Sequence, residues 1–325
     1  MSLSRLALSL ALAGGALVFG TRHLSTAPGE TGETTREAGA GTTHVAVSRT
    51  QLVLLGTGTP SPDPARSGPA VAVVVDDVPY IVDCGPGIVR RAAAAWQEKG
   101  IAGLEPARLT HVFVTHLHSD HTVGLPDLIF TPWVVGRSSP LYVFGPPGIR
   151  SMTEHLTAAY AEDIRMRSEG YEDNDPEGCK VVSVEIEAGV VYKDKRVKVT
   201  AIPVPHGQWK HAFGYRFDTP DKSIVISGDT AKSDALIEAS RGVDILVHEV
   251  LSAAVFAVLP SEMQRYHGSF HTSTIELGEV AKEAQPKLLV LYHQLFGGTD
   301  GDDLIREIRQ VWDGEVVSGN DLDVF

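Results

Sequence analysis

Short runs of apolar residues, each ended by glycine, proline or a charged residue, divide the chain from residue 51 onward. Apolar runs bounded by turn-forming residues are typical of strands. The pattern predicts strands at 52–55, 70–75, 80–83, 111–115, 141–144, 197–202, 212–217, 224–227, 245–248 and 288–293. Apolar residues at helical spacing predict helices at 88–98, 148–161, 231–239, 273–284 and 302–312. This mixture predicts an α/β domain in which layered sheets carry helices.

The N-terminal residues follow a different pattern. Arg5 precedes an apolar run over residues 6–20, and small polar residues follow. Residues 1–24 therefore read as a secretory signal, with an uncleaved N-terminal anchor as the alternative. The run is too short for a stable membrane span. Residues 25–48 are rich in Thr, Gly, Ala and Glu without periodicity, which predicts a flexible linker before one domain over 49–325. We expect an exported protein, periplasmic or extracellular.

Charge and cysteine content narrow the expected partners. The formal net charge is -13, from 28 Lys and Arg against 41 Asp and Glu, so a polyanion would be repelled. The densest basic stretch, 193–198, alternates with other residues and reads as the solvated face of a strand. Nucleic acid is therefore predicted to be an unlikely partner. Cys84 and Cys179 allow at most one disulfide, but Cys84 ends an apolar strand, which favours a buried thiol.

The densest group of chemically active side chains follows the predicted strand 111–115. The run His116-Leu117-His118-Ser119-Asp120-His121 offers four metal-ligand side chains in six residues. In extended backbone His116 and His118 share a face, and a following turn can carry Asp120 and His121 to a second position. One short loop can thus serve two metals about 3.5 to 4 Å apart, whereas one zinc needs only three or four ligands.

Three further candidates lie at or just after the ends of predicted strands. His206 follows the run 197–202, Asp229 follows 224–227, and His293 ends 288–293. A lone His after an apolar run is more often structural than a ligand. Three candidate ligands in the same topological position favour a metal site instead.

Five segments occur in a fixed order: HLHSDH at 116–121, PHGQWKHAFGYR at 205–216, SGDT at 227–230, VHEV at 247–250 and LYHQ at 291–294. In this order they resemble the metallo-beta-lactamase superfamily. GTGTP at 56–60, VDCG at 82–85, GLPDLIF at 124–130 and SFHTST at 269–274 resemble its branch of tRNA 3'-processing endonucleases and arylsulfatases. The resemblance covers residue 51 to about 295. It implies a four-layer αβ/βα sandwich with metals at one edge, between two sheets.

The resemblance also implies a ligand set for two zinc ions. The first ion would take His116, His118 and His206, the second Asp120, His121 and His293, and Asp229 would bridge them. Diiron flavoproteins of the superfamily place a Glu at the position of His118, so the histidine here favours zinc. Manganese or iron would also fit.

The expected chemistry is hydrolysis by a hydroxide that bridges the two zinc ions. The metals generate the nucleophile, so no protein nucleophile is needed. Asp120 would act within the metal centre. By resemblance, His271 is the candidate proton donor to the leaving group, and Glu249 is its partner. Surface positions without function are the alternative for these last two.

The expected substrate is a small phosphodiester or sulfate ester. Members of the branch that process tRNA carry a long inserted arm between the equivalents of His206 and Asp229, and residues 207–228 leave room only for two strands and a turn. Lactone or beta-lactam hydrolysis is the alternative, although neither cysteine lies in the motif of the thiolate-containing beta-lactamases. A metal-binding protein without turnover is a remote third. Members of this branch are often dimers, which leaves a homodimer open.

Overall fold

The structure is a computed structural model that describes residues 48–325. The predicted signal and nearly all of the predicted linker lie outside the described residues. Within residues 48–325, no helix combines the length and apolar character needed to cross a bilayer. Cys84 and Cys179 are both buried free thiols, so they form no disulfide with each other.

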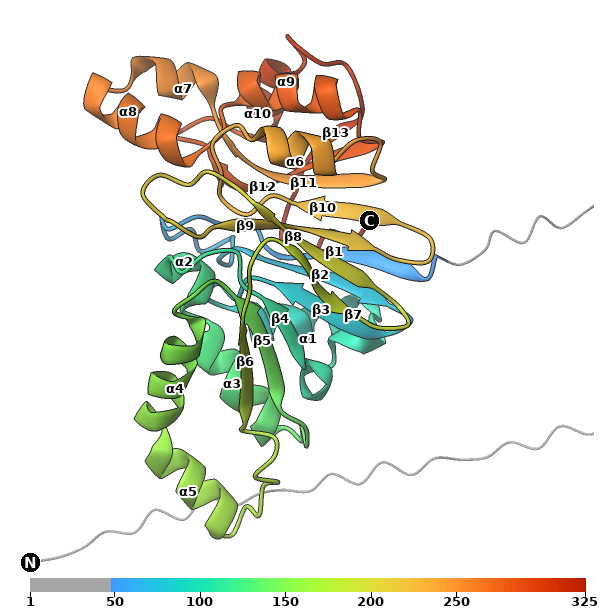
Figure 1. The fold of residues 1–325 in the computed structure, drawn as a ribbon, viewed down its shortest axis with the longest axis vertical. Coiled ribbons are helices and arrows are strands. Elements are labelled where there is room, and N and C mark those ends of the chain that lie inside the picture. Colours follow the sequence, from blue (N-terminus) through green and yellow to red (C-terminus); the bar gives the residue numbers. More distant parts are fainter. Residues whose placement is uncertain (1–47) are drawn as a thin grey trace, which may run out of the picture. The chain divides into compact units, whose positions relative to one another are not determined.

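Two mixed sheets form the centre of the described part of the chain (Figure 1). The first has six strands in sequential order: β1 (Thr50–Gly56), β2 (Ala70–Val75), β3 (Val78–Val82), β4 (His111–Phe113), β5 (Leu141–Gly145) and β6 (Val181–Glu185). The second has seven, in the order β13-β12-β11-β10-β9-β8-β7. Their bounds are β7 (Gly189–Lys193), β8 (Lys198–Pro203), β9 (Phe213–Asp218), β10 (Ser223–Ile226), β11 (Ile245–Leu251), β12 (Leu288–Leu295) and β13 (Val316–Ser318).

Strand β2 shows how the sequence builds two cores at once. All six of its residues are buried. Ala72 and Val74 point to the outer core, whereas Val71 and Val73 join the core between the sheets. Successive side chains of a strand point to opposite faces, so a strand buried on both faces must be apolar throughout. The inner core also contains stacked aromatic rings, with the centroid of Phe113 4.9 Å from that of Phe144.

Helices cover the outer faces of both sheets, which gives four layers (Figure 1). The first sheet is covered by α1 (Ile88–Lys99) and α3 (Leu125–Val134), and the second by α6 (Asp234–Ala239), α9 (Thr274–Ala284) and α10 (Gly301–Ile308). The remaining helices are α2 (Ser119–Thr122), α4 (Ile149–Ala159), α5 (Ala161–Glu169), α7 (Ala253–Val258) and α8 (Ser261–Phe270). The predicted α/β sandwich is therefore confirmed.

The structure differs from the predicted elements in several places. The segment 148–161 contains all of α4 but only the first residue of α5, because the helix breaks at Tyr160. The stretch 250–267, where no helix is predicted, contains α7 and most of α8. Helix α3 was not predicted because its apolar side chains and the internal Pro132 obscure the helical period. Strands β6 and β7 were not predicted because none of their residues is fully buried and they lack an alternating pattern.

Candidate metal centre

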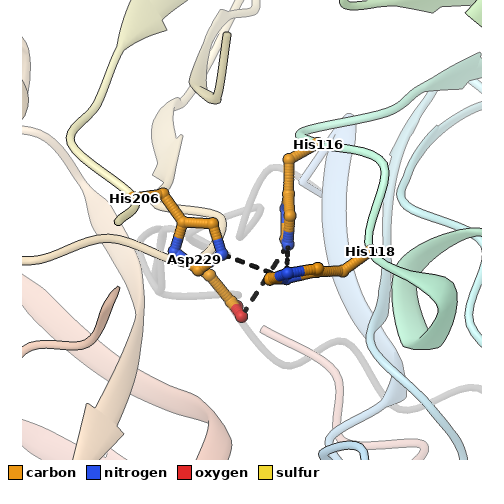
Figure 2. Close-up of side chains that lie close together, drawn as sticks. All are labelled: His116, His118, His206 and Asp229. Atoms are coloured by element: carbon orange, nitrogen blue, oxygen red, sulfur yellow. Dashed lines mark hydrogen bonds and ion pairs between the residues drawn. The ribbon is translucent and has the colours of Figure 1, made fainter. Parts of the chain in front are cut away.

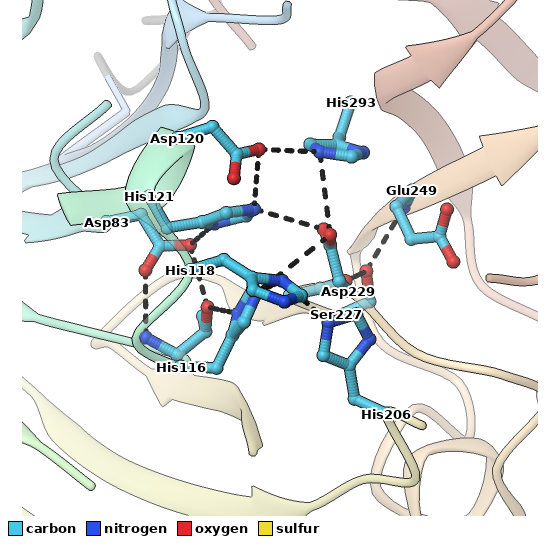
Figure 3. Close-up of polar contacts among 12 residues, drawn as sticks. Asp83, His116, His118, Asp120, His121, His206, Ser227, Asp229, Glu249 and His293 are labelled. Carbon is cyan, nitrogen blue, oxygen red and sulfur yellow. Dashed lines mark hydrogen bonds and ion pairs between the residues drawn. The ribbon is translucent and has the colours of Figure 1, made fainter. Parts of the chain in front are cut away.

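Loops and strand ends from both sheets meet at one edge of the sandwich (Figure 3). The HLHSDH run follows β4 and leads into α2, which supplies Asp120 and His121. His206 follows β8, Asp229 follows β10, and His293 lies near the end of β12. Strands β10, β11 and β12 run parallel, so their carboxyl ends point to the same edge. The structure thus brings together all seven predicted ligands.

The first set consists of His116, His118 and His206 (Figure 2). His118 Nδ1 lies 2.9 Å from His116 Nε2 and 3.1 Å from His206 Nε2. Three imidazole nitrogens therefore converge on one point. Asp229 Oδ2 approaches from the side of the second sheet, 4.0 Å from His116 Nε2.

The second set consists of Asp120, His121 and His293 (Figure 3). Asp120 Oδ2 lies 3.5 Å from His121 Nε2 and 3.3 Å from His293 Nε2. Asp229 reaches this set as well, because its Oδ1 lies 3.3 Å from His121 Nε2 and its Oδ2 lies 3.5 Å from His293 Nε2. One carboxylate therefore lies between the two sets.

A buried carboxylate behind the centre orients ligands of both sets. Asp83 Oδ2 lies 2.8 Å from His121 Nδ1, which leaves Nε2 directed at the centre. The same oxygen accepts a hydrogen bond from the Thr115 hydroxyl, whose oxygen is 3.0 Å from His116 Nδ1. Partners of this kind fix which ring nitrogen of a histidine faces a metal. In the first set, the carbonyl of Phe270 does the same for His206 Nδ1, at 3.0 Å.

The electrostatic environment keeps the first set neutral. Burial lowers the pKa of His116 and of His118, and it lowers the pKa of His206 to about 4. Charged imidazole is disfavoured in a low-dielectric surrounding, so these rings retain their lone pairs at neutral pH.

The second set is governed by its carboxylates. Burial acts to lower the pKa of His121, but Asp229 and Asp83 outweigh it and raise that pKa well above its ordinary value. Burial likewise acts to raise the pKa of Asp229, but His293 and His121 outweigh it, and the pKa falls well below its ordinary value. The negative charge of Asp229 therefore persists across the working range of pH.

The donor set fits divalent metal ions. His121 Nε2 and Asp229 Oδ1 are buried and make no directed hydrogen bond within residues 48–325. Buried polar atoms without a partner are rare in folded proteins, and a cation between these atoms would satisfy both. Imidazole nitrogen and carboxylate oxygen are donors that zinc and neighbouring divalent metals accept.

The two other predicted catalytic residues lie next to this centre. His271 is nearly buried, and one of its ring nitrogens lies within 4.8 Å of ligand atoms of Asp229 and His293. Its Nδ1 is 3.4 Å from Oε2 of the fully buried Glu249. Burial raises the pKa of Glu249. Burial acts to lower the pKa of His271, but the nearby Glu249 outweighs it, and the pKa of His271 is raised overall. Neither residue is a surface residue.

Three residues that contact the centre have no role predicted from the sequence. Asp83 and Thr115 lie in or beside the quoted segments, and VDCG entered only as part of the resemblance. Trp209 lies within the segment 205–216. Its indole N–H donates to His118 Nε2 at 2.8 Å. The only sequence signal for this contact is that Trp209 lies three residues after the candidate ligand His206.

A cavity of about 330 Å³ is lined by the apolar Val255, Leu259 and Phe296 together with Thr59, Asp63 and Arg66. His267 and Gln294, near neighbours of His271 and His293 in sequence, also line it. A second hollow shares Thr59, Ser61, Asp63 and Arg66 with this cavity and reaches Asp120. Residues of the 59–66 loop therefore line both this cavity and the hollow that reaches Asp120.

Comparison with known proteins agrees with this geometry. The family described as "Beta-lactamase superfamily domain" matches residues 80–294. A ribonuclease Z from Mycobacterium bovis (strain BCG / Pasteur 1173P2) is 32% identical over 278 residues, which cover 84% of this chain and 96% of the relative.

Two solved structures show the same fold. The metallo-beta-lactamase fold protein YhfI from Bacillus subtilis superposes with a TM-score of 0.66 at 19% identity, covering 86% of this chain and 100% of that one. The short form of human tRNase Z superposes with a TM-score of 0.60 at 23% identity, covering 85% and 98%. The chain therefore belongs to the beta-lactamase superfamily, in the branch that contains ribonuclease Z, and it is a metal-dependent hydrolase.

Proposed function

We propose that the protein hydrolyses small phosphodiesters with two zinc ions, and that sulfate esters are the related class the same site would accept. The observation that carries the proposal is the position of Asp229 between two sets of three ligand-type side chains. A single zinc would not require so many ligands. Manganese or iron in place of zinc is an outcome that metal analysis would reveal.

The chain's residues have separate tasks in this proposal. Bound zinc ions supply an acidic water as nucleophile and stabilise negative charge on the reacting oxygens. His116, His118 and His206 would hold one ion, Asp120, His121 and His293 would hold the other, and Asp229 lies within reach of both sets. His271 has its Nδ1 beside Glu249 Oε2, which leaves Nε2 to give a proton to the leaving group.

Two observations support a small substrate. The cavity that shares the 59–66 loop with the hollow at Asp120 holds about 330 Å³, at the low end of the range typical of small-molecule sites. The net charge of -13 disfavours the approach of a large polyanion. The apolar side of the cavity, formed by Val255, Leu259 and Phe296, suits an ester with one compact apolar group.

Cleavage of RNA is the second candidate, because the mycobacterial relatives carry the name ribonuclease Z. Their name weakens the prediction that nucleic acid is an unlikely partner. The match extends over 96% of the Mycobacterium bovis relative, which leaves that protein little room for a long arm either. The short connection between His206 and Asp229 therefore does not separate this chain from proteins of that name.

Export and assembly stay predictions. The location outside the cytoplasm rests on Arg5 and the apolar run 6–20. The linker over 25–48 rests on its composition without periodicity. A homodimer rests on the resemblance alone. Cell fractionation and size measurement of the full chain would test both.

The decisive experiment combines metal analysis with a substrate screen. Purified full-length protein, Asp229→Ala and the exposed control Asp313→Ala would be assayed with bis(p-nitrophenyl) phosphate, p-nitrophenyl sulfate, a lactone and a 3'-extended tRNA precursor. We expect two zinc ions per chain and phosphodiester turnover in the wild type and in Asp313→Ala. In Asp229→Ala we expect the zinc and the turnover to be lost. Turnover of the tRNA precursor alone would favour the second candidate. Absence of metal and of turnover on every substrate would make the enzyme proposal wrong.

A further inference from the structure

A tight turn after His206 carries Trp209 back over the first ligand set. The backbone N–H of Trp209 donates to the carbonyl of His206 at 3.0 Å, and the N–H of Gly207 donates to the carbonyl of Ser269 at 2.7 Å. Gly207 has a φ of 54°, and a Cβ at this position would lie 2.0 Å from the ring of Phe270. The turn therefore requires glycine and fixes where Trp209 begins.

The indole of Trp209 contacts the far side of His118. Its Nε1–H donates to His118 Nε2 at 2.8 Å, and the two ring planes are nearly perpendicular, at 86°. The other nitrogen of His118, Nδ1, is the one that faces His116 and His206. His118 thus presents one nitrogen to the first ligand set and the other to Trp209.

This hydrogen bond and metal binding by neutral His118 exclude each other. An indole nitrogen only donates, so its partner Nε2 must be the unprotonated nitrogen of the ring. A neutral imidazole that binds a metal through Nδ1 carries its proton on Nε2. Two N–H groups would then face each other over 2.8 Å, which is repulsive. Only a His118 that had lost both ring protons could bind the metal and keep this bond.

We propose that Trp209 competes with the metal for His118: binding of a metal to the first set breaks the Trp209–His118 hydrogen bond and moves the indole away. The inference rests on the proposed role of His118 as a metal ligand. Trp209 is 36% exposed, and its neighbours Gln208 and Lys210 are exposed as well. The tip of the turn therefore has room to move without disturbing the core.

Zinc affinity gives the first test, because removal of Trp209 should raise it if Trp209 is a competitor and lower it if Trp209 orients His118. Removal of an ordinary orienting partner lowers metal affinity roughly 10- to 100-fold. Removal of a competitor raises it, here by roughly two- to tenfold, the worth of one hydrogen bond. Metal-free wild type, Trp209→Phe and Trp96→Phe would be titrated with zinc against a chromophoric chelator. Trp96 is a matched control, since it is also 36% exposed and lies on α1, which supplies no ligand.

Fluorescence gives a second test, in which the indole of Trp209 itself reports on metal binding. In Trp96→Phe, zinc should shift the emission to longer wavelength as Trp209 enters water, and the shift should be absent from Trp209→Phe. Tighter zinc binding by Trp209→Phe together with this shift would support the proposal. Weaker binding by Trp209→Phe, or no shift on zinc binding, would overturn it. Failure of the wild type to bind zinc would instead contradict the proposed metal function.

Discussion

The two ligand sets contain the same number of side chains but differ in charge. His116, His118 and His206 are imidazoles that burial keeps neutral, and their only carboxylate is the shared Asp229. The other set has Asp120 of its own. A divalent cation gains more from the set with more negative charge, so we expect the second set to bind more tightly and to accept harder metals such as manganese.

The difference also concerns protons. Asp229 and Asp83 raise the pKa of His121, so this ring tends to carry protons on both nitrogens when no metal is bound. Ligands must be deprotonated before they bind a metal. Metal binding at the second set should therefore release a proton, whereas the neutral rings of the first set need not. The two sets thus combine one strongly charged, proton-linked site with one neutral site that Trp209 contacts.

Removal of one ligand from each set should have the largest effect and would test whether the sets hold separate ions. We expect His206→Ala and His293→Ala each to retain one zinc per chain. In both variants kcat on bis(p-nitrophenyl) phosphate should fall by roughly a thousandfold, because each metal contributes several kcal/mol to transition-state stabilisation. Elemental analysis and steady-state kinetics measure both quantities. Loss of both ions from either variant would show that the sets do not bind independently.

The sequence was most informative where one short segment carries the signal. Strand β2 is apolar at every position, and the HLHSDH run places four ligand-type side chains in six residues, so neither depends on distant parts of the chain. The positions of His206, Asp229 and His293 at strand ends then predicted a shared edge. These three side chains and the four of the HLHSDH run meet in the structure.

Contacts between distant residues were less predictable. Asp83 and His121 are separated by 38 positions, and Trp209 and His118 by 91, so both hydrogen bonds depend on how turns orient side chains. Helix α7 has only six residues, and α8 includes Gly268 and buries none of its residues, so neither shows a helical pattern. These elements become evident only when the chain packs around the site.

Acid should act on the two sets with opposite sign in the metal-free protein. His206 has a folded-state pKa of about 4, below its ordinary value, so its contribution is complete above pH 6.5 and is lost as the pH falls toward 4. The loss is roughly 3 kcal/mol at most. His121 has a raised pKa, so its contribution is present at low pH and is lost as the pH rises through that value.

Chemical denaturation of the chelated protein between pH 4 and 9 measures this difference. Compared with the wild type, His206→Gln should lose less stability as the pH falls from 6.5 to 4, and His121→Gln should lose less stability as the pH rises above 6.5. Parallel pH profiles for all three proteins would contradict the assigned charge states of the two sets.

Replacement of Asp83 should have a smaller effect that still differs between the sets. Asp83 Oδ1 accepts the backbone N–H of Thr115 at 2.8 Å, while Oδ2 faces His121 Nδ1. In Asp83→Asn one of these positions becomes an amide N–H group, so one contact is lost. Asparagine tolerates the φ of 60° at this position, which limits the effect on the backbone.

We expect Asp83→Asn to lower zinc affinity of the second set roughly 10- to 100-fold, because Asp83 orients His121 directly. The first set should weaken less, since its link to Asp83 runs through the Thr115 hydroxyl. Each set can be titrated alone in the His206→Ala or His293→Ala background. Asp76→Asn is a matched control, because Asp76 also has a positive φ, 47°, but lies on the surface and pairs with Arg49. Equal losses of zinc affinity in both sets would show that Asp83 supports the centre as a whole and does not act mainly through His121.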